Sequence, residues 1–233
     1  MSFFRLSRCC FLLILGYMFF LPCISSAVHL YSWEARYPLP AGKTIHITYG
    51  NNMFVVVGGY YGSSTILTSG DGISWTSRSP GTGSHLRGSC YDGTIITSPD
   101  GISWTQRSSG TSAYLADAAY GANTFVTIGH DGVMLTSPDG IAWTPQSSGT
   151  TAYLHGITYG KGIFVVVGFN GALLTSADGI TWTPRRSGTA SDLHGVTYGN
   201  NIFVAVGHSS TILRSKDGIR WESMGLGIPS YLR

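Results

Sequence analysis

The segment Ser176-Ala177-Asp178-Gly179-Ile180-Thr181-Trp182 decides the fold, because closely related segments occur five times along the chain. The other four copies are residues 69–75, 98–104, 137–143 and 215–221, and all five share Ser, Asp, Gly, Ile and Trp at the same places. Successive tryptophans of these copies are 29, 39, 39 and 39 residues apart. A period of this length indicates a protein built from one repeated structural unit.

A second motif precedes four of the copies and defines the rest of the unit. It has the form Tyr-Gly-x-x-x-Phe-Val-x-Val/Ile-Gly and occurs at 49–58, 120–129, 159–168 and 198–207. The complete unit 153–186 predicts four short strands, at 153–159, 163–167, 172–176 and 180–185, because Gly, Asn and Asp turn residues separate them. Four antiparallel strands every 39 residues predict an all-β protein, a β-propeller of about five four-stranded blades.

The Ser-x-Asp-Gly-Ile-x-Trp segment has a predicted structural role in each blade. The aspartate accepts backbone N–H bonds across its own turn, the glycine adopts a positive φ, and the tryptophan packs between neighbouring blades. The residues concerned are Asp71, Asp100, Asp139, Asp178 and Asp217, with Trp75, Trp104, Trp143, Trp182 and Trp221.

These five copies resemble the Asp-box (BNR) repeats of sialidase-superfamily β-propellers, written roughly Ser-x-Asp-x-Gly-x-x-Trp, although each copy here is one residue shorter between Asp and Gly. The resemblance covers almost all of residues 28–233 and implies a propeller. It does not define a function, because Asp-boxes occur in glycosidases and in lectin-like and receptor domains. The pairing of the two motifs is most similar to photosystem II stability/assembly factor-like propellers.

Two irregularities affect the number of blades. The second unit is ten residues short, because the Tyr-Gly-x-x-x-Phe-Val segment is missing between Tyr91 and Asp92, so this blade is expected to lack one strand. Either residues 79–85 form an extended link and 86–91 a strand, or ten codons have been lost. Residues 30–37 resemble an additional outermost strand, which leaves a closed ring, an open arc and a six-bladed assembly with a partner as alternatives.

Residues 1–27 are expected to be a secretory signal peptide, with Arg5 and Arg8 before an apolar stretch at 9–21. An uncleaved membrane anchor is the alternative. The protein is therefore expected to be secreted or periplasmic, and membrane association remains open. Without the leader the net charge is near +1, so we expect no basic stripe for nucleic acid on the remaining chain. Cys90 then has no cysteine partner within the chain and is expected to be a small buried residue.

Strand parity predicts where a ligand binds. The turns after the first and third strands of each blade lie on one rim, whereas the turns after the second and fourth strands lie on the other. The first rim is nearly identical from unit to unit, and the second varies, with Tyr114, Tyr153 and Asp192 in its longer loops. Exposed aromatic, amide and imidazole groups suit sugar stacking and hydrogen bonding. The candidate ligand-binding residues of the variable rim are Tyr60, Tyr61, His130, Asp131, Phe169, Asn170 and His208.

His155 and His194 occupy the same position of the innermost strand in two units, so both are expected to face the central channel. We add them to the candidate binding residues. A metal site would require a third ligand at short range, and none is indicated. The sequence therefore predicts neither a metal nor another cofactor.

The sequence does not predict an enzyme, and we assign no catalytic residue. A glycosidase needs two facing carboxylates, but the only glutamates, Glu34 and Glu222, directly follow a tryptophan of an outermost strand. The leading hypothesis is an exported, non-catalytic recognition module that binds a glycan or a protein through the variable rim. The alternatives are an assembly or scaffold factor that docks on a membrane protein complex, and a degenerate sialidase-like glycosidase. The oligomeric state is left open.

Overall fold

The computed structural model describes residues 44–50, 52–60, 63–80 and 93–224, with the backbone alone for 44–50, 58–60, 63 and 64. This part of the chain is nearly all β, with four antiparallel four-stranded sheets and one two-stranded sheet. Within it, no helix has the length and hydrophobicity needed to cross a membrane. The predicted signal peptide, the strand-like segment 30–37, Tyr61 and Cys90 lie outside the described residues.

Each sheet forms one blade, and the blades follow one another along the chain. Blade 1 contains β1 (Thr44–Gly50), β2 (Met53–Tyr60), β3 (Ser63–Ser69) and β4 (Thr76–Arg78). Blade 2 contains β5 (Ile95–Thr97) and β6 (Thr105–Arg107). Blade 3 contains β7 (Leu115–Gly121), β8 (Thr124–Gly129), the 3-10 turn η1 (His130–Gly132), β9 (Met134–Ser137) and β10 (Thr144–Pro145). Blade 4 contains β11 (Leu154–Gly160), β12 (Ile163–Gly168), the 3-10 turn η2 (Phe169–Gly171), β13 (Leu173–Ser176) and β14 (Thr183–Pro184). Blade 5 contains β15 (Leu193–Gly199), β16 (Ile202–Gly207), β17 (Ile212–Ser215) and β18 (Glu222–Ser223).

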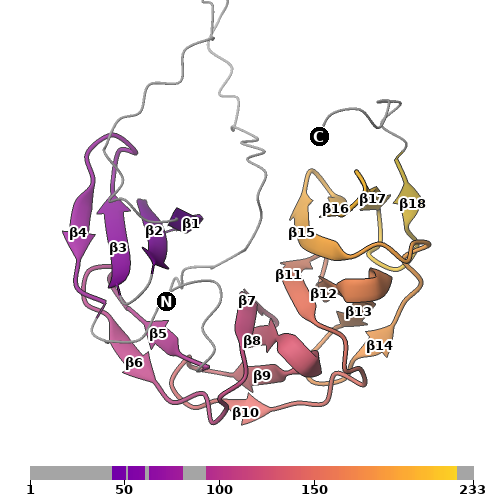
Figure 1. The fold of residues 1–233 in the computed structure, drawn as a ribbon, viewed down its shortest axis with the longest axis horizontal. Helices are drawn as coiled ribbons and strands as arrows, with labels where there is room; N and C mark the ends of the chain where they lie inside the picture. The colour runs from indigo at the N-terminus through magenta and orange to yellow at the C-terminus, as the bar shows by residue number, and fades with distance from the viewer. Residues whose placement is uncertain (1–43, 51, 61–62, 81–92, 225–233) are drawn as a thin grey trace, which may run out of the picture.

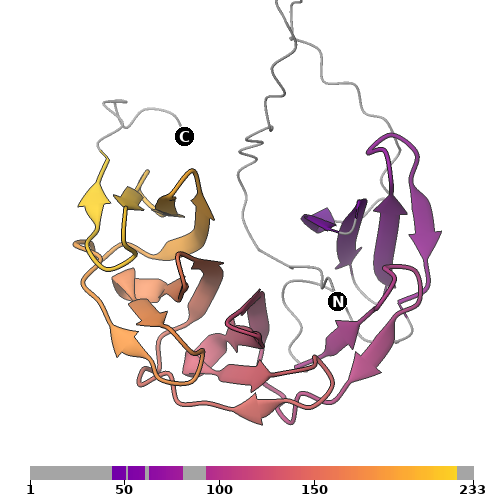
Figure 2. The same cartoon turned by 180° about the vertical axis from the view of Figure 1, so that it is seen from behind.

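The blades are arranged radially, which confirms the predicted β-propeller. The strands β1, β7, β11 and β15 lie innermost, and the last strand of each blade lies on the outside (Figure 1). Blades 1 and 5 stand at opposite ends of an open arc in both views (Figures 1 and 2). In blade 2 the structure describes only the two outer strands; the predicted strand at 86–91 lies outside the described residues.

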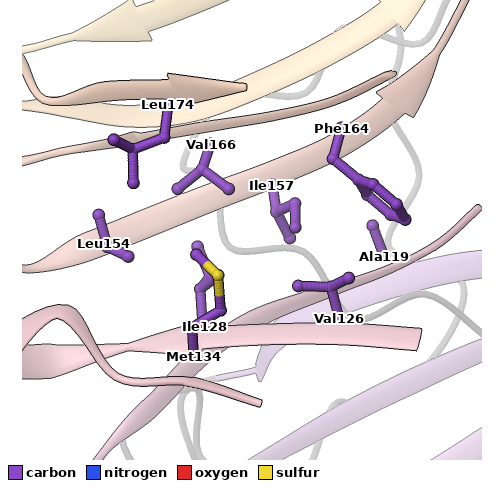
Figure 3. Packing of buried hydrophobic residues seen from close by; sticks show 9 residues of the cluster. All are labelled: Ala119, Val126, Ile128, Met134, Leu154, Ile157, Phe164, Val166 and Leu174. Carbon is purple, nitrogen blue, oxygen red and sulfur yellow. The ribbon is translucent and has the colours of Figure 1, made fainter. Parts of the chain in front are cut away.

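The hydrophobic core lies between blades. Val126, Ile128 and Met134 of blade 3 pack against Leu154, Phe164 and other apolar residues of blade 4 (Figure 3). A second cluster joins blades 4 and 5 in the same way. Each fully buried side chain of this size stabilises the fold by about 1.5–3 kcal/mol. Because a blade buries its faces only against its neighbours, each joint depends on the repeat being continued.

The Asp-Gly turns have the predicted geometry. In blade 4, the Asp178 Oδ1 atom accepts the N–H groups of Ile180 and Thr181, both at 2.8 Å. Gly179 has a φ of +77°. The indole N–H of Trp182 donates to the Gly179 carbonyl at 3.0 Å, and its ring packs on the core between blades 3 and 4. The same carboxylate bonds recur in the other four copies.

These hydrogen bonds stabilise the charged form of the aspartates. The N–H groups of Thr181 and Ile180, followed by the Ser176 hydroxyl, lower the pKa of Asp178 from 3.8 to about 2. In blade 1 the corresponding groups of Ser74, Ile73 and Ser69 lower the pKa of Asp71 to about 2. The pKa of the equivalent carboxyl in the remaining turns is lowered by the same kind of bonds (Asp100, Asp139 and Asp217).

The outermost strands are shorter than expected. The fourth strand of the unit was predicted at 180–185, but β14 covers only Thr183–Pro184. The N–H groups of Ile180 and Thr181 bind the Asp178 carboxylate and are therefore not available to a β-ladder. Ile180 consequently projects outward and is 56% exposed.

Candidate functional site

The variable rim is formed in part by the turn that follows the second strand of each blade. After β8 and β12 the chain makes single 3-10 turns, in which Asp131 and Asn170 have φ values of 54° and 55°. Asp and Asn tolerate this left-handed conformation better than most residues. Because the two turns have the same shape, His130 and Phe169 occupy equivalent positions on blades 3 and 4.

A serine loop after the outermost strand holds each of these turns in place. The Ser187 hydroxyl donates to the Gly171 carbonyl at 2.7 Å, and Ser148 makes the same bond to Gly132. A side chain at Gly171 would collide with the carbonyl of Thr189, so the position requires glycine. This role was not predicted, although Ser-Gly-Thr recurs in the sequence at 109–111, 148–150 and 187–189.

Seven aromatic and imidazole rings form a continuous row across blades 3, 4 and 5, which we call the rim row. His130 lies between two tyrosines, with ring centroids 4.0 Å from Tyr114 and 4.1 Å from Tyr153, and it is stacked on the latter. Tyr153 lies 5.2 Å from Phe169. The row is made of Tyr114, His130, Tyr153, Phe169, His155, His194 and His208.

The two inner-strand histidines connect the rim to the innermost strands. The His155 ring on β11 lies 4.6 Å from Phe169 and 5.2 Å from His194 on β15, and His194 lies 4.3 Å from His208. The turns after the second strands carry His130, Phe169 and His208, and the innermost strands carry His155 and His194. The ring contacts join all five residues in one row. His155 is buried and His208 is exposed, so the row extends from the interior of the arc to solvent.

Asp192 adds a charged acceptor at one end of the row. Its Oδ1 atom accepts the Asn170 N–H at 2.8 Å, and its Oδ2 atom lies 3.5 Å from Nδ1 of His208. The bond to Asn170 crosses from blade 5 to blade 4. Asn170 therefore contributes its backbone to the rim, while its side chain is exposed.

Two further predicted residues are placed differently. Tyr60 ends β2 and pairs with Ser63 of β3, whereas in blades 3 and 4 a 3-10 turn directly follows the second strand. Asp131 is exposed beside His130 and lines a shallow hollow with Ser148 and Thr150.

Asp117 has a role that the sequence analysis did not identify. This buried residue of β7 accepts the N–H of Ile157 on β11 through Oδ2 at 2.9 Å and the N–H of Ala118 through Oδ1 at 2.8 Å. The other complete units with described side chains have Gly156 and Gly195 at this position. The single Asp among glycines was the signal in the sequence.

The described carboxylates and imidazoles form no group of three that could hold a metal ion. Glu222 lies on the outermost strand β18 and pairs with Arg214 at 3.1 Å, remote from the innermost strands that carry His155 and His194. Glu34 lies outside the described residues.

The fold and the site together define the class of protein, which is a β-propeller with a row of aromatic and imidazole rings on its variable rim. Solved structures with a similar fold include two of YCF48. The chain aligns with YCF48 from Cyanidioschyzon merolae at a TM-score of 0.57 and 16% identity, over 77% of this chain and 71% of that chain. It aligns with a structure described as YCF48 bound to D1 peptide at a TM-score of 0.58 and 18% identity, over 76% of this chain and 64% of that chain. No family model and no curated protein matches the sequence.

Proposed function

We propose that the protein is a non-catalytic recognition module that binds an extended protein segment through the rim row. The observation that carries the proposal is the continuity of the row, which joins seven rings from three consecutive blades. Buried or half-buried aromatic rings supply most of the binding energy in many protein interfaces. A row held by rigid turns requires little reordering when a ligand binds.

The chemistry of the row favours a segment with both apolar and polar groups. Tyr153 and Phe169 offer ring faces, whereas the imidazoles and the Asp192 carboxylate offer hydrogen bonds. An extended peptide presents apolar side chains and backbone N–H and C=O groups in alternation, which matches this mixture. A structure of similar fold is described as bound to a peptide, which supports a protein ligand over a glycan.

Docking on a membrane protein complex is the more specific form of the same proposal. The predicted leader at 1–27 would bring the propeller to a membrane surface or beyond it. A segment of a membrane protein that emerges from the bilayer would then be the ligand. We do not propose a glycosidase, because no pair of facing carboxylates supports one among the described residues.

Selection from a displayed peptide library, run beside a glycan array, tests the proposal. We expect peptides to be enriched and their affinity to fall about tenfold or more for Phe169→Ala, because an interface ring is replaced by a methyl group. Tyr120→Ala is the matched control, since Tyr120 is 46% exposed and lies beside the turn of the opposite rim. Saccharide selectivity without peptide enrichment would instead establish glycan recognition.

A further inference from the structure

Consecutive blades are joined by one recurring contact. The Asp-Gly turns of blades 4 and 5 each press a glycine against the second strand of the blade before. A Cβ atom on Gly179 would lie 2.9 Å from Cγ2 of Val126 on β8, and one on Gly218 would lie 2.7 Å from Cδ1 of Ile163 on β12. We call the receiving surface the seat; in blade 4 it includes Ile163 and Val165 of β12, which lie next to Gly218. It requires a neighbour whose turn has no side chain at this position.

Blade 5 has a seat that no other described blade covers. Its Val204, Val206 and Ile212 are partly exposed. The equivalent residues of blade 4, which blade 5 covers, are Val165, Val167 and Leu173, exposed by 0%, 0% and 2%. Beside the open seat is a pocket of about 200 Å³ lined by Ile202, Arg214, Ser215, Lys216, Asp217, Arg220 and Glu222.

Blade 1 has the complementary feature, an Asp-Gly turn that is not seated. Among described residues, the three atoms nearest to a Cβ on Gly72 all belong to Phe54 of the same blade, the closest at 3.4 Å. Gly72 is partly exposed, whereas the equivalent glycines of the other four turns are buried (Gly101, Gly140, Gly179 and Gly218). On the face of blade 1 that carries this turn, the side chains of Val56 and Leu67 are buried. The part of the face that remains exposed is therefore the turn itself.

We propose that the open seat of blade 5 binds the Asp-Gly turn of blade 1 from a second copy of this chain. The joint would repeat the contact that already unites blades 3 and 4 and blades 4 and 5. A second copy is required because blades 1 and 5 of one chain stand at opposite ends of the arc (Figures 1 and 2). A contact between two different surfaces is head-to-tail, so it yields a ring or a growing chain of copies.

Charge supports the same pairing. Asp71 is the only charged residue of the turn at 69–75. The pocket at the seat has three basic side chains, from Arg214, Lys216 and Arg220, against the two acidic ones of Asp217 and Glu222. Arg214 replaces a threonine of the other blades and is paired in the sheet with Val204 of the seat, so blade 5 differs from the other blades at this surface. This inference does not depend on the proposed ligand of the rim row.

Analytical ultracentrifugation of the purified full chain over a wide concentration range tests the proposal with one variant at each end. Val204→Glu introduces a charge into the seat at a partly exposed position, so the single copy can fold while the joint is lost. Gly72→Asn keeps a residue that tolerates positive φ but adds a side chain to the turn. Thr144→Glu, at an exposed position on the outer strand of blade 3, is the control.

We expect the wild type and Thr144→Glu to sediment as assemblies whose mass rises with concentration. Each end variant alone should weaken the association by about tenfold or more. Mixing Val204→Glu with Gly72→Asn should restore a 1:1 dimer, because each variant retains the end that the other lacks. Two results would overturn the proposal: a wild type that is monomeric at every concentration, or an assembly that Val204→Glu disrupts and Gly72→Asn leaves unchanged.

Discussion

The Asp117 carboxylate on β7 accepts the backbone N–H of Ile157 on β11 at 2.9 Å and so ties blade 3 to blade 4 inside the protein. Both partners lie next to a register shift in their sheets, between Leu115 and Asp117 in blade 3 and between Leu154 and Gly156 in blade 4. Asp117 is therefore part of the joint between blades 3 and 4.

Removing this bond should destabilise the joint. We expect Asp117→Ala to lower the free energy of unfolding by about 1–3 kcal/mol, because a buried acceptor is lost. Asp117→Asn retains one acceptor oxygen and should cost less. Urea unfolding checks both, with Asp131→Asn as a control that should stay within about 0.5 kcal/mol of the wild type because Asp131 is exposed. Equal stability of Asp117→Ala and the wild type would refute the role.

The glycine at the joint between blades has a different test. Gly179→Ala places a Cβ at a φ of +77° and 2.9 Å from Val126. Gly188→Ala has nearly the same φ, +79°, but meets no atom within 4 Å. In both variants the positive φ should lower the free energy of unfolding by about 1 kcal/mol. Crowding against Val126 should lower it by about 1–3 kcal/mol more in Gly179→Ala. Equal losses in thermal or urea unfolding would show that the contact between blades contributes nothing.

Acid should weaken the propeller through its Asp-Gly turns. The folded pKa of Asp71 and of Asp178 is about 2, below the value of about 3.9 expected in the unfolded chain. A lowered folded pKa gives stability that is fully present above about pH 5 and is lost as the pH falls towards 2. The free energy of unfolding measured between pH 6 and pH 2 should therefore fall, and it should fall less steeply for Asp178→Asn. A free energy of unfolding that does not change over this pH range would contradict the stabilising role of these carboxylates.

The sequence predicted the repeat because each blade is a local structure. The blades and the Asp-Gly turns depend on contacts within a unit or with the next unit, and they were found where expected. Trp104, Trp182 and Trp221 pack in clusters between blades, as predicted. The fourth strand was predicted too long, because hydrophobic residues alone do not reveal that Asp178 binds the N–H groups of Ile180 and Thr181.

The rim row was only partly predictable. Strand parity placed His130, Phe169 and His208 on one rim, and the matching positions of His155 and His194 placed both on the innermost strands. That these rings touch one another depends on the shape of two 3-10 turns and on the angle between blades. The bond of Asp117 joins residues 40 positions apart and uses a carboxylate where blades 4 and 5 have Gly156 and Gly195, so the repeat does not predict it.

The central proposal, recognition through the rim row, is tested most directly by NMR titration of the protein with a selected peptide. The imidazole signals of His130, His155, His194 and His208 report on the row, and the indole N–H signals of Trp143, Trp182 and Trp221 report on the Asp-Gly turns of the opposite rim. We predict that the imidazole signals shift in a saturable way while the indole signals stay in place. Saturable shifts of the indole signals with unchanged imidazoles would contradict the account.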